Sequence, residues 1–270
     1  MITHAKKLFI KTSLFITFLT LPLAYAVGFH NIEQRVTRII DGDTFEISGG
    51  QRVRLLGIDA PEKGEEISVR AADRLRELTA SGKVILEMCE KPDTYGRLLA
   101  TVRSNGINVN EALLKEGMAL PMLIPPCGRS VATEILQAAA QGALSGKGIY
   151  SLVKFRIISH VEAGSHIGES IMVRGRIRNL HRGSKAWHLN FGSDWKTDFT
   201  AVLFDQGLNM FNDLGMDLAD LVGVEVLVIG KVKLFNGPEI IVHSPDQLIP
   251  LKSGTISDSG SGIQGGSQVE

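Results

Sequence analysis

Apolar and polar positions alternate over residues 34–59, where β-branched and aromatic side chains are frequent, and this pattern predicts strands. The sequence DGD at 41–43 and the pair Gly49-Gly50 interrupt the alternation as turns. Apolar residues then recur every three positions over 66–81, which predicts a helix that ends before Gly82. Strands are expected again over 83–90 and 96–109, the second forming a hairpin around Asn105-Gly106. Two further helices are expected over 109–119 and 130–148.

The order of these elements is three strands, a helix, two strands and two helices. That order fits a small closed β-barrel of the OB type with three helices packed around it. Residues 155–250 contain five more strand candidates, at 169–183, 185–192, 198–204, 224–237 and 239–244, and a helical stretch near 207–221 after the third. The sequence therefore predicts a mainly β fold with α-helices (α+β), in which a second OB-like β-barrel domain follows the first.

The first 26 residues have the pattern of a secretory signal peptide. Lys6, Lys7 and Lys11 precede an apolar run over 14–23, and Ala24-Tyr25-Ala26 has the small-x-small form of a cleavage site. The alternative is a single membrane anchor, but the run is shorter than the roughly 20 residues that a span needs. We therefore expect a secreted or periplasmic protein without a membrane segment after cleavage. The expected domains are 1–26 signal peptide, 27–152 first barrel, 153–250 second barrel and 251–270 disordered Gly/Ser-rich tail.

Composition and charge limit the classes of function. The chain has 270 residues, of which 44% are apolar and 21% charged, as expected for a globular protein of about two domains. Cleavage would remove three lysines from a chain with 29 basic and 29 acidic residues, leaving a net charge of −3. This charge argues against tight, indiscriminate binding of nucleic acid, which needs many cations. Any nucleic-acid site must therefore be local.

The chain has two cysteines, Cys89 and Cys127. In an oxidising compartment two cysteines can pair, and this pair would close a loop of about 38 residues, worth about 4 kcal/mol in the chain-entropy model. The alternative is two buried free thiols. The sequence favours a disulfide without deciding the question.

Carboxylates and arginines gather at the ends of the predicted strands in the first barrel. Mature residues of this barrel include one histidine, His30, and no nucleophile elbow, P-loop or CxxC motif. Oxygen ligands suit a hard cation such as Ca²⁺ or Mg²⁺, and fixed guanidinium groups suit a phosphate. Each residue alone has a structural explanation, as a turn former or a solvated charge. Together they form a set that can cleave a phosphodiester: Asp41, Asp43, Arg54, Asp59, Glu62 and Arg97.

The order DGDT, RLLGIDAPE, DTYGR, VNEALLKEGMA and a closing GIY resembles the staphylococcal (thermonuclease) nuclease family over residues 34–151. The resemblance implies an OB-fold enzyme that uses one Ca²⁺ to hydrolyse DNA and RNA to products with 3′-phosphate ends. By the same resemblance, Asp43 and Asp59 would be carboxylate ligands of the Ca²⁺. The backbone carbonyl of Ala60 would be the third protein ligand, although the family often has threonine there.

The resemblance also implies roles for the remaining residues. Glu62 would hold or deprotonate the attacking water, and Arg54 and Arg97 would bind the phosphate and stabilise the transition state. Tyr95 would contact the nucleotide, and Asp41 would support the turn from outside the metal's ligand shell. All six charged residues are present, which favours an enzyme over a non-catalytic binding or scaffold protein that kept the fold.

The chain departs from the family pattern at its substrate-binding surfaces. Thr94 replaces a lysine before the tyrosine, and Leu123 and Pro125 stand where tyrosines would pack on the base. The lysine-rich loop after the glutamate is shortened to KGEE. These changes leave the catalytic set intact but weaken base stacking and phosphate attraction.

The second barrel combines aromatic and basic residues that would suit a platform for single-stranded nucleic acid. The alternative is that the aromatic residues fill the barrel and the arginines form a solvated face; a third option is an envelope protein whose second domain binds protein or glycan. A monomer is expected. The residues concerned are Trp187, Phe191, Trp195 and Phe199 with Arg174, Arg176, Arg178, Arg182 and Lys185.

Overall fold

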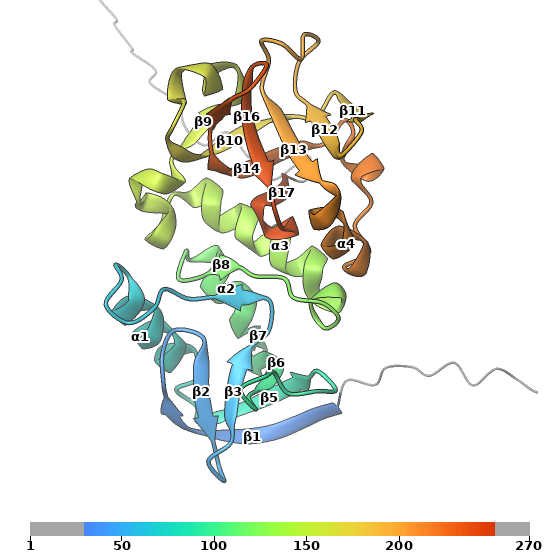
Figure 1. Cartoon of the computed structure of the whole chain (residues 1–270). Coiled ribbons are helices and arrows are strands. Elements are labelled where there is room, and N and C mark those ends of the chain that lie inside the picture. The colour runs from blue at the N-terminus through green and yellow to red at the C-terminus, as the bar shows by residue number, and fades with distance from the viewer. Residues whose placement is uncertain (1–29, 252–270) are drawn as a thin grey trace, which may run out of the picture.

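The computed structural model describes residues 30–251 (Figure 1). The signal-peptide prediction for residues 1–26 and the tail prediction for 252–270 lie outside the described residues. Leu251, which the sequence assigned to the tail, is instead buried and pairs with Glu225 in the last strand. Within residues 30–251, every helix is too short or too polar to cross a membrane.

The first unit is a closed five-stranded barrel, which confirms the predicted OB fold. Antiparallel pairs join β1 to β2 and β5, β2 to β3, and β5 to β6, and a parallel pairing of β3 with β6 closes the ring. A short extension, β7, pairs with β6, and a separate antiparallel pair joins β4 to β8. The strands are β1 (His30–Ile39), β2 (Thr44–Ile47), β3 (Arg52–Leu55), β4 (Ile58–Asp59), β5 (Lys83–Met88), β6 (Leu98–Ser104), β7 (Ile107–Asn108) and β8 (Leu120–Pro121).

Three helices accompany this barrel, as the apolar periodicity predicted. α1 packs its buried Ala71, Leu75 and Leu78 inward. Asn108 is the N-cap of α2, and its side chain accepts a hydrogen bond from the Glu111 amide. α3 packs against α2 and has an alanine-rich buried face. The helices are α1 (Ser68–Leu78), α2 (Val109–Lys115) and α3 (Gly128–Ser145).

The second unit shares most of the strand pairing of the first, but its strands form two separate sheets, ordered β17-β14-β10-β9 and β11-β12-β13-β16-β15. β10 pairs antiparallel with β14, β11 with β12 and β12 with β13, and β13 pairs parallel with β16. Helix α4 follows β13, in the position of the helix that follows the third strand of an OB fold. The elements are β9 (Ile157–Ser159), β10 (Ser170–Arg176), β11 (Asn179–Arg182), β12 (Ala186–Asn190), β13 (Thr200–Phe204), α4 (Asp205–Asp213), β14 (Glu225–Lys231), β15 (Lys233–Leu234), β16 (Pro238–Val242) and β17 (Leu248–Leu251), with five short 3₁₀ helices, η1 (Gly148–Ser151), η2 (Val153–Phe155), η3 (His160–His166), η4 (Leu218–Leu221) and η5 (Pro245–Gln247).

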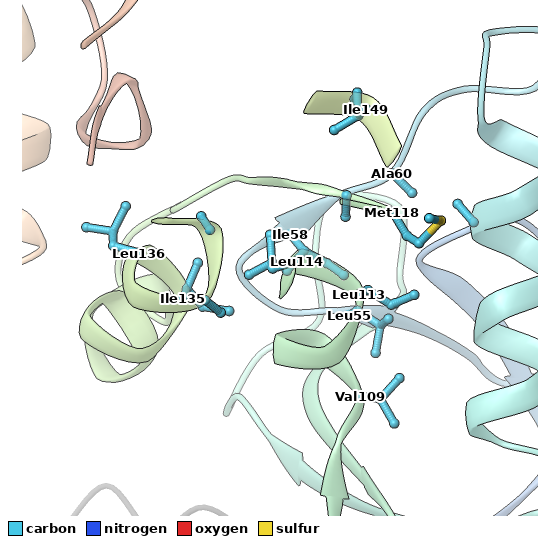
Figure 2. Close-up of a cluster of buried hydrophobic side chains, with 14 of the residues drawn as sticks. Leu55, Ile58, Ala60, Val109, Leu113, Leu114, Met118, Ile135, Leu136 and Ile149 are labelled. Carbon is cyan, nitrogen blue, oxygen red and sulfur yellow. The ribbon is translucent and has the colours of Figure 1, made fainter. Parts of the chain in front are cut away.

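Helix α3 lies between the two sheets in Figure 1 and shares its core with both. Leu136 of α3 belongs to a buried cluster that also includes Met172, Leu227 and Ile249 of the second unit. The same cluster contains the side chains labelled in Figure 2, in which Leu55 lies near Leu113 and Ile58 lies near Leu114. The strands that carry the candidate site are therefore fixed by one continuous apolar core.

A second buried cluster lies within the second unit. Phe191 and Phe199 are 0% and 1% exposed, with ring centroids 4.9 Å apart, and belong to this core. They are therefore not available to stack on nucleic acid. Arg174, one of the basic residues predicted for the platform, forms a two-point ion pair with Glu225. Of the aromatic residues predicted as a platform, Trp195 is the one that is mostly exposed, at 54%.

Candidate functional site

The turn DGD between β1 and β2 places Asp43 inside the protein. The Asp43 amide donates to Asp41 Oδ1 at 3.1 Å, which gives Asp41 a role in shaping the turn. A Cβ at Gly42 would meet the Cβ atoms of Ala60 and Ala71 at 2.6 and 2.7 Å, so only glycine lets the turn pack this closely. The motif is thus both a turn and the support of a buried carboxylate.

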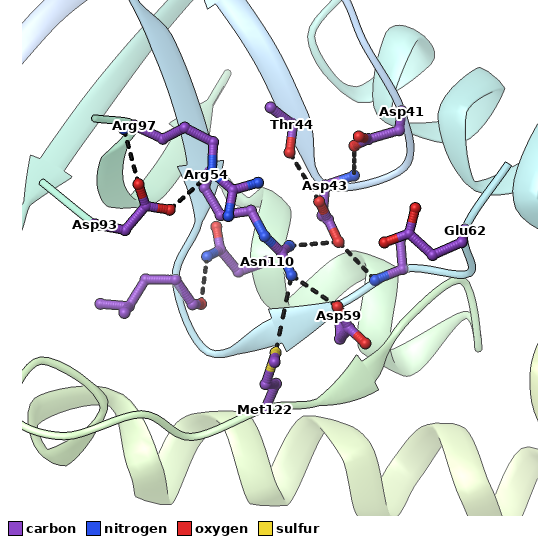
Figure 3. Close-up of polar contacts among 12 residues, drawn as sticks. Asp41, Asp43, Thr44, Arg54, Asp59, Glu62, Asp93, Arg97, Asn110 and Met122 are labelled. Atoms are coloured by element: carbon purple, nitrogen blue, oxygen red, sulfur yellow. Dashed lines mark hydrogen bonds and ion pairs between the residues drawn. The ribbon is translucent and has the colours of Figure 1, made fainter. Parts of the chain in front are cut away.

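Arg54 of β3 joins the two predicted metal-binding carboxylates (Figure 3). Its Nη2 lies 2.7 Å from Asp59 Oδ1, and its Nη1 forms an ion pair with Asp43 Oδ2 that lacks the geometry of a hydrogen bond. The Arg54 side chain is only 10% exposed, whereas that of Asp59 is 48% exposed. Met122 Sδ lies 3.9 Å from the same guanidinium. Asp43 and Asp59, distant in the sequence, therefore converge on one cation.

Asp43 has further partners that fix its orientation. The Ala60 amide donates to Asp43 Oδ2 at 2.6 Å, and the Thr44 hydroxyl donates to Oδ1 at 3.0 Å. Burial raises the pKa of Asp43 to about 6, although the charge of Arg54 and the Ala60 hydrogen bond act in the opposite direction. The structure thus places Ala60 beside Asp43.

The loop between β5 and β6 carries a second guanidinium. Arg97 Nε donates to Asp93 Oδ2 at 2.7 Å, and the amides of Tyr95 and Arg97 donate to Asp93 Oδ1. Burial alone would raise the pKa of Asp93, but these hydrogen bonds and the charge of Arg97 lower it overall. Within residues 30–251, the two Nη groups of Arg97 make no hydrogen bond, so they are free to bind an anion.

Glu62 and Tyr95 are the exposed members of the predicted set. The Glu62 amide donates to Glu65 Oε2 at 2.9 Å, and in Figure 3 the Glu62 carboxylate is turned toward Asp43. In the same view, Arg97 and Glu62 lie on opposite sides of the Arg54–Asp43 pair. Tyr95 is 83% exposed, and the Arg97 guanidinium lies 5.3 Å from its ring centroid. The predicted charged residues therefore surround one surface.

The buried side chain of Asn110 supports the backbone of the site, and the sequence analysis did not identify it. Its Oδ1 accepts from the Val102 amide at 3.0 Å, and its Nδ2 donates to the carbonyls of Leu56 and Ala100 at 2.8 and 3.2 Å. These bonds tie α2 to β6 and to the turn between Arg54 and Asp59. The sequence offered one signal: Asn110 lies in the first turn of α2, on the same buried face as Val109, Leu113 and Leu114.

The turn after Arg54 also requires a glycine. Gly57 has a φ of +82°, and a Cβ there would meet Ile135 Cγ1 of α3 at 2.8 Å. Its carbonyl accepts from the Met122 amide at 2.9 Å, and Asp59 in β4 pairs with Leu120 in β8. The strand end that carries Asp59 is therefore held by α3 and by the segment before it.

Cys89 and Cys127 form a disulfide in this structure, with Cα atoms 5.9 Å apart. Cys89 follows β5, before the loop that carries Arg97, and Cys127 precedes α3. The bridge therefore joins the Arg97 loop to the segment that contains Met122. The disulfide therefore links the backbone segment that carries Arg97 to the one that carries Met122.

One acidic residue of the second unit lies within electrostatic reach of the site. Burial raises the pKa of Asp246 in η5, and the negative charge of Asp59 raises it further. Among the described residues, no group of three or more histidine, cysteine, aspartate or glutamate side chains is arranged as a metal cluster. Metal binding here would rest on Asp43 and Asp59 with backbone oxygens.

Comparison with known sequences supports the resemblance that these residues carry. The family described as "Staphylococcal nuclease homologue" matches residues 52–151, which include Arg54, Asp59, Glu62 and Arg97. "Protein ParB" of Escherichia coli is 34% identical over 128 residues, 43% of this chain and 71% of that protein. The chain belongs to the staphylococcal nuclease homologue family.

Two other relatives have names that state an activity. An "Uncharacterized endonuclease" of Escherichia coli O157:H7 is 38% identical over 93 residues, 33% of this chain and 60% of that protein. A "Micrococcal nuclease" of Shigella flexneri is 39% identical over 97 residues, 31% of this chain and 55% of that protein. The chain thus spans less than two thirds of the length of these two relatives.

Proposed function

We propose that this protein is a Ca²⁺-dependent nuclease that hydrolyses phosphodiester bonds in DNA, RNA or both, as an endonuclease that leaves 3′-phosphate ends. The observation that carries the proposal is the convergence of Asp43 and Asp59 on Arg54, near Arg97, whose Nη groups make no hydrogen bond to residues 30–251. Membership of the family and the names of the relatives support it.

The donor set fits a hard cation. Asp43 and Asp59 with the carbonyl of Ala60 would hold the ion, and oxygen ligands of this kind are those that Ca²⁺ prefers. When bound, the ion supplies positive charge that polarises a phosphate oxygen. Arg54 balances both carboxylates in this structure. With both carboxylates engaged in holding the ion, the Arg54 guanidinium would be available to bind a phosphate.

The protein's own residues would then divide the remaining work. Glu62, exposed and turned toward Asp43, accepts the proton of the attacking water. Arg97 binds the phosphate through its free Nη groups and stabilises the charge that develops in the transition state. Asp93 holds Arg97 through Nε, so that its Nη groups keep their direction. Tyr95, beside Arg97, contacts the nucleotide.

The test is digestion of denatured DNA and of RNA with Ca²⁺ and with excess EGTA. We expect cleavage that EGTA abolishes, and a fall of about 10²–10⁴-fold in kcat for Glu62→Gln and Arg97→Ala. Matched controls are Glu66→Gln, an exposed glutamate of the same loop, and Arg103→Ala, which loses only its pair with Glu87. Equal digestion by wild type and the two site variants would refute the assigned roles. Binding without digestion would indicate a non-catalytic protein that kept the fold.

The compartment and the assembly state belong to the same proposal. A secreted or periplasmic location agrees with the disulfide, because such bonds persist in oxidising compartments. The proposed assembly state is a monomer. Fractionation of cells that express the tagged chain, with mass determination of the mature N-terminus, would test export and cleavage after Ala26. A cytoplasmic, uncleaved chain would refute it. Light scattering after size exclusion would test the monomer.

The second barrel is proposed to capture single-stranded substrate for the first. The strand arrangement supports this role, because OB folds bind oligonucleotides on the face of their second and third strands. Those strands here are β12 and β13. Deleting residues 155–270 would remove part of the core that the two units share, so a loss of binding in such a variant could reflect unfolding. Point variants on this face are therefore the better test.

A further inference from the structure

A cavity of about 510 Å³ opens on the second barrel, away from the residues assigned to catalysis. Its walls come from β11, β12, β13 and β16 and from two loops, 191–199 and 235–237. Its volume falls in the range of about 300–1,000 Å³ that is typical of sites for small molecules. The cavity is therefore large enough for a group the size of a nucleobase.

The floor of the cavity is a chain of oriented side-chain hydrogen bonds. The Thr200 hydroxyl donates to Asn190 Oδ1 at 3.2 Å, and Asn190 Nδ2 donates to Asn179 Oδ1 at 2.8 Å. The direction of this chain leaves the Asn179 amide as a donor, and it makes no hydrogen bond to any residue from 30 to 251. Amide groups fixed in this way can read the edge of a base by donor and acceptor pattern.

Two histidines and one glutamate extend the polar lining. His181 and His188 face each other across β11 and β12 with ring centroids 6.1 Å apart. Burial lowers the pKa of His188, and the neighbouring His181 lowers it further, which favours the neutral ring. Burial raises the pKa of Glu239, although Lys233 opposes the shift. The lining can thus both donate and accept hydrogen bonds without a strong charge of one sign.

Two exposed aromatic rings stand at the mouth of the cavity on structured loops. Trp195 is 54% exposed and Phe235 is 69% exposed, and both line the cavity. The Trp195 loop is closed by Asp198, which accepts from the Asp194 amide at 2.8 Å. The Phe235 amide donates to the Gly237 carbonyl at 3.0 Å, so the second loop is also a tight turn. Large rings held in water on such turns are suited to stack on a flat ligand.

We propose that this cavity is a base-binding subsite for single-stranded nucleic acid, in which one nucleobase stacks on Trp195 and meets the Asn179 amide with its edge. The inference rests on the proposed nuclease function and deepens it by placing substrate capture on named residues. Base stacking on aromatic side chains is tolerant of sequence, because every base has a flat face. The subsite therefore distinguishes single strands from duplexes, whose bases are already stacked.

Three cations near the cavity can bind phosphates, and they lie beside three acidic residues, Asp194 and Asp198 of the Trp195 loop and Glu239 of the lining. Lys196 lies with Nζ 5.7 Å from the centroid of the Trp195 ring, and Arg178 is exposed directly before Asn179. Lys233 in β15 stands across from Glu239. Cations beside a stacking ring are the arrangement that follows a strand with its bases on aromatic faces and its phosphates outside.

The test is binding of labelled oligomers of about eight nucleotides to the full chain in EGTA, which prevents hydrolysis if the proposed function holds. The probes are oligo(dT), oligo(rU) and an abasic oligomer with the same number of phosphates, followed by fluorescence anisotropy. We expect binding of the base-carrying oligomers and at least about fivefold weaker binding of the abasic one. The DNA and RNA probes separate the two sources of the base.

Variants of the cavity and matched controls complete the experiment. We expect Trp195→Ala and Asn179→Ala each to weaken binding at least about fivefold. Phe204→Ala and Asn212→Ala remove an exposed aromatic ring and an exposed amide elsewhere in the same unit, and should stay within about twofold of wild type. Equal affinity for abasic and base-carrying oligomers, or unchanged binding by Trp195→Ala, would overturn the proposal. So would binding of a neutral oligosaccharide that oligonucleotides do not displace.

This result is independent of the nuclease assay. Base-dependent binding without Ca²⁺-dependent digestion would refute the catalytic proposal and leave the subsite standing as a binding module. Digestion without base-dependent binding would refute the subsite alone.

Discussion

Substitution of Asn110 by alanine should destabilise the protein far more than an ordinary polar-to-alanine change in a helix. The side chain is 1% exposed and serves three backbone groups on two other segments. Removing it leaves the Val102 amide and the Leu56 carbonyl without their partner. The Ala100 carbonyl keeps a second hydrogen bond, from the Leu56 amide at 2.8 Å.

The magnitude follows from the two orphaned groups. Each buried polar group left without a partner costs about 1–3 kcal/mol, so the pair predicts a loss of about 2–6 kcal/mol. A water molecule that enters the vacated space would reduce this cost, since the site offers polar partners for it. We therefore expect a loss of about 3 kcal/mol in the free energy of unfolding. The turn between Arg54 and Asp59 should also lose its anchor, so that activity falls in the folded variant.

Urea denaturation at equilibrium measures the free energy of unfolding. The dependence of this free energy on urea concentration (the m-value) should be the same for wild type and variant if unfolding remains two-state. The matched control is Asn108→Ala, two residues earlier, which removes the N-cap of α2 and should cost about 1 kcal/mol. If Asn110→Ala cost no more than Asn108→Ala, the buried amide would not be what holds these segments together. Kinetic assays without urea, at a temperature at which both variants are folded, would then separate activity from folding.

Three further outcomes follow from the structure. Gly42→Ala should lower the melting temperature and cost about 1–3 kcal/mol, because its Cβ collides with two others, whereas Gly164→Ala, with open space around it, should be neutral; similar losses would contradict the packing argument. Replacing Cys89 and Cys127 together by serine should cost about 4 kcal/mol in denaturation, and a double variant as stable as the oxidised protein would refute this. Asp93→Asn should destabilise at pH 7. Because the folded pKa of Asp93 is lowered, its contribution is present above about pH 4 and is lost as the pH falls through the folded value, so the deficit should shrink in acid; a deficit that grows there would be the contrary result.

The sequence by itself determined the main strands and helices of both units and the candidate charged residues, but not β9, β17, the β4–β8 pair or the break between β10 and β11. Turn signals such as Asn105-Gly106 and the three-residue periodicity of 66–81 are local, so they can be read without the fold. Asp43, Asp59 and Arg54 were identified because they are charged residues at the ends of predicted strands, in motifs whose order resembles that of the nuclease family. Leu251 was misassigned because its pairing partner, Glu225, lies far back in the chain.

The tertiary structure alone decided which of these residues touch. Arg54 could have faced a phosphate or the carboxylates, and only the closed barrel shows that it binds Asp43 and Asp59. The roles of Asn110 and of the Asn179–Asn190 chain depend on partners that are far away in sequence or on neighbouring strands. The physical reason is that secondary structure follows from short-range propensity, whereas the burial, pairing and pKa of a polar group are set by whichever distant segments the core brings to it.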